Sequence, residues 1–202
     1  MTNHQIPITN RAAGREQIRA SESQLTAEDY FQTHDPYERS ELLRGIVVPL
    51  ECPGFQHGLI CGQANYVLQR YLEDHPVGRV LSNDSGVITQ RDPDTVRGGD
   101  VTFYSYDRVP ENESPDGYPN VSPNVVFEVR SPNDRWSEIH EKIAEYLRAG
   151  VELVCVLVPE TAAAHLFYPD RPGEIRQGDE ELTLPAPLSE FRQPISRFFA
   201  GS

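Results

Sequence analysis

Residues 123–132 read PNVVFEVRSP, an apolar and β-branched run that contains one carboxylate, Glu128. Successive side chains of a β-strand point to opposite faces, so Val125, Phe127 and Val129 share one face and Glu128 lies on the other. A carboxylate is seldom buried unless a cation or hydrogen-bond donors pair with it. We therefore expect this strand to lie inside the molecule, with Glu128 facing inward or lining a cleft.

The segments around this strand predict the fold class. A helical pattern follows it, and residues 153–158 then form a second continuously apolar run, LVCVLV. Such runs are typical of central strands, and a helix between two of them forms a right-handed crossover. We therefore predict an α/β protein with a mixed β-sheet flanked by α-helices. Other predicted elements are helices from Thr26 and over residues 56–74, a hairpin over residues 40–49, and strands at 79–81, 86–90, 100–104, 163–168, 174–176 and 181–184.

The helix after the Glu128 strand carries a lysine on its apolar side. Ile139, Lys142, Ile143 and Tyr146 are spaced i, i+3, i+4 and i+7, which places them on one helix face, and Glu145 falls on the opposite, wet face. A lysine head group is costly to desolvate, so on such a face it reaches solvent or a carboxylate. Either Lys142 extends to solvent from the edge of the stripe, or carboxylates of the sheet hold it.

A second acid, Asp100, begins the apolar strand at residues 100–104. Two acids on strands with a lysine nearby suit hydrolysis assisted by a divalent ion. Carboxylates bind Mg²⁺ or Mn²⁺, the ion polarises a phosphoryl oxygen and acidifies water, and a lysine orients the nucleophile or stabilises charge. Glycoside hydrolysis by the two acids stays open, although it gives Lys142 no clear role. The sequence lacks the Gly-x-Ser-x-Gly elbow of a serine hydrolase.

The length and charge of the chain limit its number of domains and its possible partners. Residues 1–24 are polar and aperiodic and are predicted to form a flexible tail, and residues 25–202 a single domain. The formal net charge is −13, with 18 basic residues against 31 acids. Phosphate contacts need clustered lysine and arginine, so we expect any DNA contact to be weak or local. No apolar run approaches the roughly 20 residues of a membrane span, and we expect a cytoplasmic protein.

The three cysteines, Cys52, Cys61 and Cys155, form no CxxC pair. Their odd number predicts reduced thiols in the cytoplasm. A zinc site made of Cys52, His57 and Cys61 would lack a fourth ligand at a known spacing, so we give it little weight. His57 lies near the buried side of its predicted helix, and we interpret it as a structural histidine rather than as a general base or metal ligand.

A series of short motifs is more specific than these patterns. In chain order they are Tyr37-Glu38, Glu41-Leu42 with Gly45, Pro53 with His57, Gly99-Asp100-Val101, Glu128-Val129-Arg130-Ser131-Pro132-Asn133-Asp134, Lys142 with Glu145-Tyr146 and Ala149-Gly150-Val151, and Pro159-Glu160. With these motifs the chain resembles the Uma-two family of restriction-endonuclease-like proteins over residues 25–168. The EVxSP block and the KxxEYxxAGV helix are its most distinctive parts.

The resemblance implies a PD-(D/E)xK nuclease fold whose active site consists of Glu41, Asp100, Glu128 and Lys142. The three acids would bind Mg²⁺ or Mn²⁺, and the protein would be an endonuclease that hydrolyses phosphodiester bonds in DNA. Nuclease-fold proteins often pair to cut two strands, so the resemblance also implies a homodimer. The sequence by itself would leave Glu41 solvated, as is normal for a hairpin glutamate.

Two positions depart from the family pattern. The proline expected before the aspartate is Gly99, which alters the backbone preference and keeps the carboxylate. The standard nuclease motif has a lysine two residues after the acid, where this chain has Arg130. A guanidinium stays protonated and cannot replace a lysine that exchanges protons, so we expect Lys142 to substitute for it.

Two functions are compatible with these residues. The first is a metal-dependent nuclease, which the complete set of acids and lysine favours. The second is a catalytically inactive nuclease-fold protein that serves as a binding or assembly module, which the net charge of −13 favours. The loop over residues 107–123, rich in proline and polar residues, faces the substrate or a dimer partner, or is a tolerated insertion.

Overall fold

The computed structural model describes residues 24–33 and 39–201, so most of the predicted tail, and Tyr37 and Glu38 of the family motifs, lie outside the described residues. The helices are α1 (Ala27–Thr33), α2 (Phe55–Asp74) and α3 (Trp136–Arg148), with the 3-10 helices η1 (Pro159–Thr161) and η2 (Ile195–Phe199). The strands are β1 (Ser40–Leu43), β2 (Ile46–Pro49), β3 (Gly78–Gln90), β4 (Thr95–Ser105), β5 (Val125–Val129), β6 (Leu153–Val158), β7 (Ala163–Phe167), β8 (Glu174–Gln177), β9 (Glu181–Thr183) and β10 (Arg192–Pro194).

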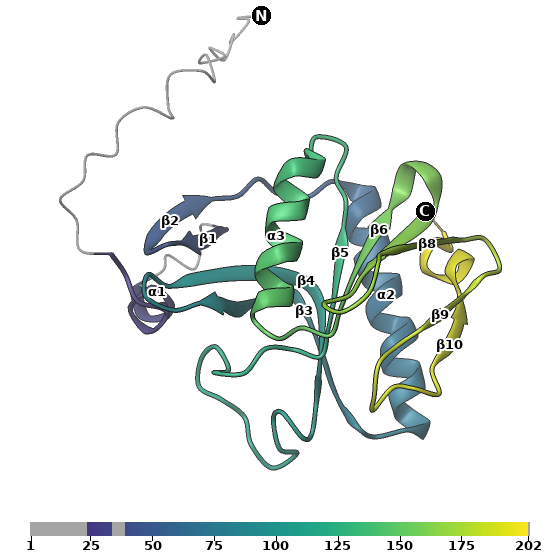
Figure 1. The fold of residues 1–202 in the computed structure, drawn as a ribbon, viewed down its shortest axis with the longest axis horizontal. Helices are drawn as coiled ribbons and strands as arrows, with labels where there is room; N and C mark the ends of the chain where they lie inside the picture. The colour runs from purple at the N-terminus through teal and green to yellow at the C-terminus, as the bar shows by residue number, and fades with distance from the viewer. Residues whose placement is uncertain (1–23, 34–38, 202) are drawn as a thin grey trace, which may run out of the picture.

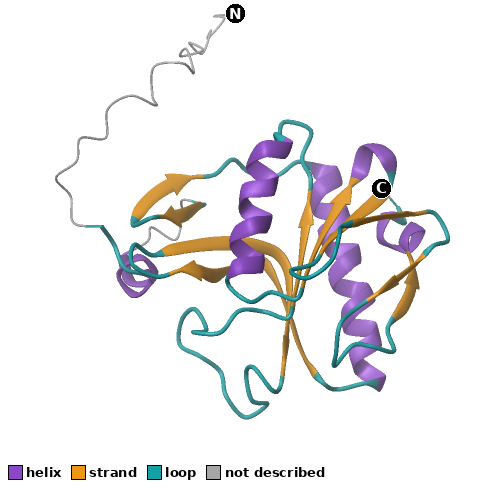
Figure 2. Cartoon of the chain, viewed as in Figure 1, coloured by secondary structure: helices purple, strands orange, loops and turns teal. Residues whose placement is uncertain are grey.

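Eight of these strands form one mixed sheet (Figure 1). Its order is β2-β1-β4-β5-β6-β7-β8, with β3 paired to β4. The β5 and β6 strands run parallel and are joined through α3, whereas β4 and β7 pair antiparallel with them. Strands β9 and β10 form a separate pair beside α2, as Figure 2 shows. The predicted mixed sheet flanked by helices is confirmed, and the two strands of the predicted crossover, β5 and β6, are neighbours in it.

The two faces of β5 are buried against different helices, as its alternation predicts. Phe127 packs in a cluster with Ile60 of α2, whereas Val126 packs with Ile143 and Tyr146 of α3. Each of these side chains is at most 4% exposed. Burial of such a side chain contributes about 1.5–3 kcal/mol, so a strand buried on both faces fixes both helices relative to the sheet.

The strand β3 differs from the prediction. Residues 79–81 and 86–90 belong to one strand instead of two, and the pairing with β4 shifts between Ser82 and Ser85. Asn83 and Asp84 there have φ of 66° and 54°. Asparagine and aspartate tolerate this left-handed conformation better than other non-glycine residues. The strand therefore passes through an irregularity instead of ending at it.

The hairpin of β1 and β2 positions Glu41. The chain turns at Arg44 and Gly45, whose φ values are 51° and 78°, as a tight turn with two left-handed residues requires. The β1 strand pairs with β4 through Leu42 and Val96. Glu41 is thereby brought to the sheet next to the strand that carries Asp100.

Candidate active site

Lys142 projects from α3 toward the sheet. Its Nζ donates hydrogen bonds to Glu128 Oε2 and to the carbonyl oxygen of Gly98, each at 2.9 Å, and lies 3.4 Å from Glu41 Oε1. The side chain is 22% exposed. Of the two interpretations of Lys142 from the sequence, the structure shows the one in which carboxylates hold the lysine.

Glu128 lies on the α3 side of β5. Its second oxygen, Oε1, accepts a hydrogen bond from the Tyr146 hydroxyl at 2.8 Å. Burial raises the pKa of Glu128 to about 7, and the nearby negative charge of Asp100 adds to this increase. Lys142 and Tyr146 act to lower the pKa, but they offset only part of the increase. Glu128 therefore carries a proton for part of the time at neutral pH.

Asp100 lies where two strands separate. The ladder between β4 and β5 ends at the pair of Val101 and Phe127. Beyond it, Asp100 Oδ2 accepts a hydrogen bond from the backbone nitrogen of Val129 at 2.7 Å. The Asp100 carboxylate thus replaces a main-chain acceptor for the backbone nitrogen of Val129, the residue that follows Glu128 in β5.

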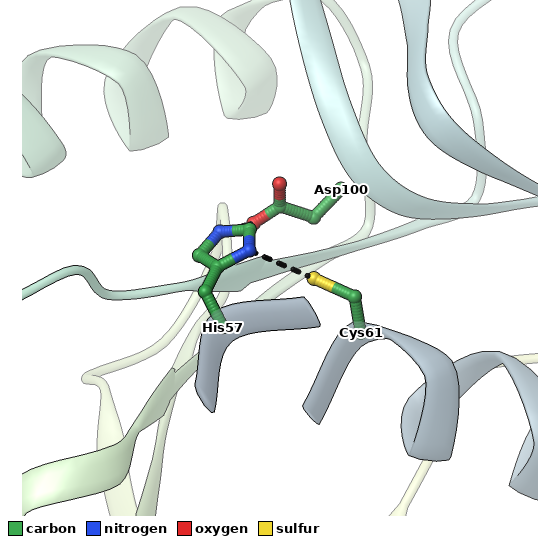
Figure 3. A group of neighbouring side chains, drawn as sticks. All are labelled: His57, Cys61 and Asp100. Carbon is green, nitrogen blue, oxygen red and sulfur yellow. Dashed lines mark hydrogen bonds and ion pairs between the residues drawn. The ribbon is translucent and has the colours of Figure 1, made fainter. Parts of the chain in front are cut away.

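Asp100 also contacts α2 (Figure 3). His57 Nε2 lies 3.3 Å from Asp100 Oδ2. Burial acts to raise the pKa of Asp100, but the hydrogen bond from His57 and the charge of Lys142 lower it below its usual value. Burial acts to lower the pKa of His57, and Asp100 outweighs this and raises it. Asp100 is therefore ionised at neutral pH.

Gly99 stands where the family pattern has proline, at a close approach of two parts of β4. A Cβ atom on Gly99 would lie 2.5 Å from Thr102 Cγ2 and 3.7 Å from the Tyr146 hydroxyl. The Gly99 position therefore faces α3, whereas the Asp100 carboxylate contacts His57 of α2 and the backbone nitrogen of Val129.

Glu41 is buried, with 5% of its side chain exposed. It accepts hydrogen bonds from the backbone nitrogen of Gly98 at 3.0 Å and from Arg97 Nη1 at 2.9 Å. Burial acts to raise the pKa of Glu41, but the positive charges of Lys142 and Arg97 outweigh it and lower the pKa. The expectation from the sequence alone, a solvated glutamate, is wrong because β1 docks against β4.

Two further charged residues of this site were not identified from the sequence. Arg97 Nε and Nη2 donate to the two carboxylate oxygens of Glu145 at 2.6 and 3.0 Å, and both side chains are less than 15% exposed. The helical pattern placed Glu145 on the wet face, which is wrong because Arg97 reaches it from β4. The predicted strand began at residue 100 and left out residue 97, whereas β4 (Thr95–Ser105) includes it.

Removal of Arg97 tests whether this chain of ion pairs supports the fold. Arg97→Met leaves Glu41 and Glu145 buried without their arginine, so we expect the free energy of unfolding to fall by about 3–5 kcal/mol in chemical denaturation. Arg70→Met is the matched control, because the pair of Arg70 with Glu73 is more than half exposed and is worth less than about 1 kcal/mol. Equal losses in the two variants would contradict a structural role for Arg97.

Arg130 is held away from the acids of the site. Its Nη1 donates to Glu160 Oε1 at 2.7 Å, its Nη2 to the carbonyl of Asp134 at 3.2 Å, and its guanidinium carbon lies 5.5 Å from the ring centroid of Trp136. The cation that pairs with Glu128 is Lys142.

A second grouping of possible metal ligands involves Asp100. His57, Cys61 and Asp100 each offer one donor atom, and these atoms lie within 4.8 Å of one another (Figure 3). The structure thus brings together two members of the zinc site considered from the sequence, His57 and Cys61, with Asp100 in place of Cys52, which is exposed. Glu41 and Glu128 are not in this group and face Lys142 instead.

The fold and the site can be compared with known proteins. The Uma2 family model, described as “Putative restriction endonuclease”, matches residues 27–196. A solved structure described as “a putative nuclease belonging to DUF820 from Anabaena variabilis” superposes with a TM-score of 0.73 at 16% identity, over 87% of this chain and 98% of that one. No curated protein matches the sequence. Within the described residues, no helix has the length and apolar character needed to cross a membrane.

Proposed function

Because the chain belongs to the Uma2 family of restriction-endonuclease-like proteins, we propose that it is a metal-dependent endonuclease that hydrolyses phosphodiester bonds in DNA. The observation that carries the proposal is Lys142, whose half-buried ammonium lies 2.9 Å from Glu128 and 3.4 Å from Glu41 and whose charge acts on the ionised Asp100. We propose Glu41, Asp100, Glu128 and Lys142 as the catalytic set, within a single domain over residues 25–202.

The donor set fits a hard divalent ion. Four buried or half-buried acids, Glu41, Asp100, Glu128 and Glu145, face two cations, Lys142 and Arg97, which leaves an excess of two negative charges when all four are ionised. Carboxylate oxygens are the ligands that Mg²⁺ and Mn²⁺ prefer. Asp100 and Glu128 would hold the ion, with Glu41 sharing its carboxylate between the ion and Arg97. When bound, such an ion polarises the phosphoryl oxygen and acidifies water.

The residues of the chain would act on the substrate through charge. Burial acts to lower the pKa of Lys142, but the carboxylates of Glu128, Glu41 and Asp100 outweigh it and raise the pKa. Lys142 therefore stays protonated and would stabilise negative charge on a phosphate instead of accepting a proton. Tyr146, whose hydroxyl donates to Glu128, orients that carboxylate.

The acidic composition shapes the proposed interaction with DNA. With a net charge of −13, the contact should be weak or local and should strengthen at low salt or with divalent ions. We also propose that the enzyme is a homodimer, because two paired sites would cut both strands together, and that it works in the cytoplasm, where its three free cysteines would stay reduced.

A cleavage assay tests the proposed function. We expect the protein to cleave DNA slowly with Mg²⁺ or Mn²⁺ and Asp100→Asn to reduce the rate at least about 100-fold, because the variant loses a charged ligand of the ion. The fold of the variant is checked by circular dichroism, and Asp116→Asn, at an exposed loop residue, is the matched control. Equal activity of Asp100→Asn and wild type would show that cleavage arises elsewhere.

The alternative is a catalytically inactive binding or assembly module. It is favoured by the acidic charge and by the hydrogen bonds that already occupy Glu41 and Glu128. No binding of Mg²⁺ or Mn²⁺ in a metal titration, together with no cleavage of DNA or RNA, would make this alternative the better conclusion.

A further inference from the structure

The N-terminal part of α2 presents two donor side chains of different chemistry to β4. His57 and Cys61 are spaced i, i+4 and therefore lie one helical turn apart on the same face. A hydrogen bond of 3.4 Å joins His57 Nδ1 and Cys61 Sγ, and His57 Nε2 lies 3.3 Å from Asp100 Oδ2. The three side chains converge between the helix and the strand, as Figure 3 shows.

The donor set differs from that of the carboxylate site. One nitrogen, one sulfur and one oxygen within 4.8 Å of one another suit a borderline ion such as Zn²⁺, whereas Mg²⁺ and Mn²⁺ prefer oxygen ligands alone. Asp100 is buried and the other two are partly exposed, so a fourth position can be taken by water. The charges that act on the Cys61 sulfur are the carboxylates of Asp100, Asp84 and Glu128, which favour a cation there, and the weaker opposing charge of Arg39.

We propose that His57, Cys61 and Asp100 form a binding site for Zn²⁺ or a transition-metal ion of similar softness. Cys61 binds as the thiolate and releases its proton to solvent on binding. In the metal-free protein, burial raises the pKa of the Cys61 thiol, so the thiol stays protonated until the ion arrives.

Asp100 belongs to both this site and the carboxylate site. An ion bound to His57, Cys61 and Asp100 withdraws Asp100 from the hard ion, so Zn²⁺ should inhibit cleavage supported by Mg²⁺. This consequence rests on the proposed nuclease function, whereas the metal site itself does not.

Cobalt substitution tests the site without any need for activity. The full-length reduced protein is titrated with Co²⁺, and we expect a near-ultraviolet charge-transfer band from a cobalt–thiolate bond, which Zn²⁺ then displaces. Cys61→Ser should abolish the band, and His57→Ala should weaken Co²⁺ binding at least about 100-fold, because losing a direct ligand should cost no less than the roughly 10–100-fold loss caused by removing an outer-shell partner. Cys52→Ser, which removes an exposed thiol, should leave the band unchanged.

The outcomes separate the metal site from the nuclease. A band that is lost in Cys61→Ser, that needs more Co²⁺ in His57→Ala and that is unchanged in Cys52→Ser supports the site, even if the protein cleaves nothing. A band that persists in Cys61→Ser, or no band at saturating Co²⁺, overturns it. If the wild type cleaves DNA, the Zn²⁺ concentration for half-inhibition should rise at least about 100-fold in Cys61→Ser, each variant being compared with its own zinc-free rate.

Discussion

Lys142→Met is expected to reduce the rate of DNA cleavage at least about 100-fold, because the variant loses the half-buried ammonium that faces the proposed metal ligands. In this structure the lysine contacts Glu128, Glu41 and the Gly98 carbonyl. Methionine has a side chain of similar length, which can still reach from α3 toward the sheet, and it removes only the charge and the hydrogen bonds. Initial rates at saturating Mg²⁺ on one DNA substrate measure the effect.

The control for this prediction is the neighbouring cation. Arg130→Met removes a charge that pairs with Glu160 and should change the rate less than about threefold if Lys142 has replaced the lysine of the standard motif. Because Lys142→Met leaves Glu128 without its cation, while Glu41 keeps Arg97, and costs up to about 3–5 kcal/mol of stability, its unfolding curve is measured in parallel. A folded Lys142→Met that cleaves like the wild type, or a larger loss in Arg130→Met, would contradict the assignment.

Glu128→Gln is expected to stabilise the metal-free protein above neutral pH. The pKa of Glu128 is raised from 4.5 to about 7 in the folded state, so between these values the unfolded state releases a proton that the folded state keeps. The free energy of unfolding therefore falls as the pH rises through this window, by on the order of 3 kcal/mol, and the contribution is lost above the folded pKa. Glutamine mimics the protonated acid and should remove this fall.

Urea denaturation from pH 5 to pH 8 measures the difference between wild type and Glu128→Gln. The difference is needed because the raised pKa of His57 also lowers stability as the pH rises, and does so in both proteins. Added Mg²⁺ should restore the stability of the wild type more than that of the variant. Parallel curves for the two proteins without metal would refute the raised pKa of Glu128.

The parts of the fold that could be predicted are those set by local patterns. The alternation of β5 predicted which face carries Glu128, and the helical spacing placed Lys142 and Tyr146 on the apolar face of their helix, which packs on the sheet. Both predictions need only the geometry of one element and the cost of burying a charge.

The parts that could not be predicted depend on contacts between distant residues. Arg97 meets Glu145 across 48 residues of chain, and the helical pattern alone placed that glutamate in solvent. Asp100 reaches His57 because β4 and β5 separate beyond Val101, a divergence that no local pattern encodes. Such contacts follow from how elements are placed relative to one another, which residue spacing does not contain.

The position of Lys142 makes the binding of a metal ion an exchange of one cation for another. An ammonium attached to α3 already pairs with Glu128 and Glu41, so it acts as a tethered competitor whose effective concentration at the site far exceeds that of a free ion. The acids can therefore assemble before any ion arrives, and the fold does not depend on one. The same tether should keep the metal affinity low and the exchange of ions fast, since the lysine can pair with the two carboxylates again as soon as an ion leaves.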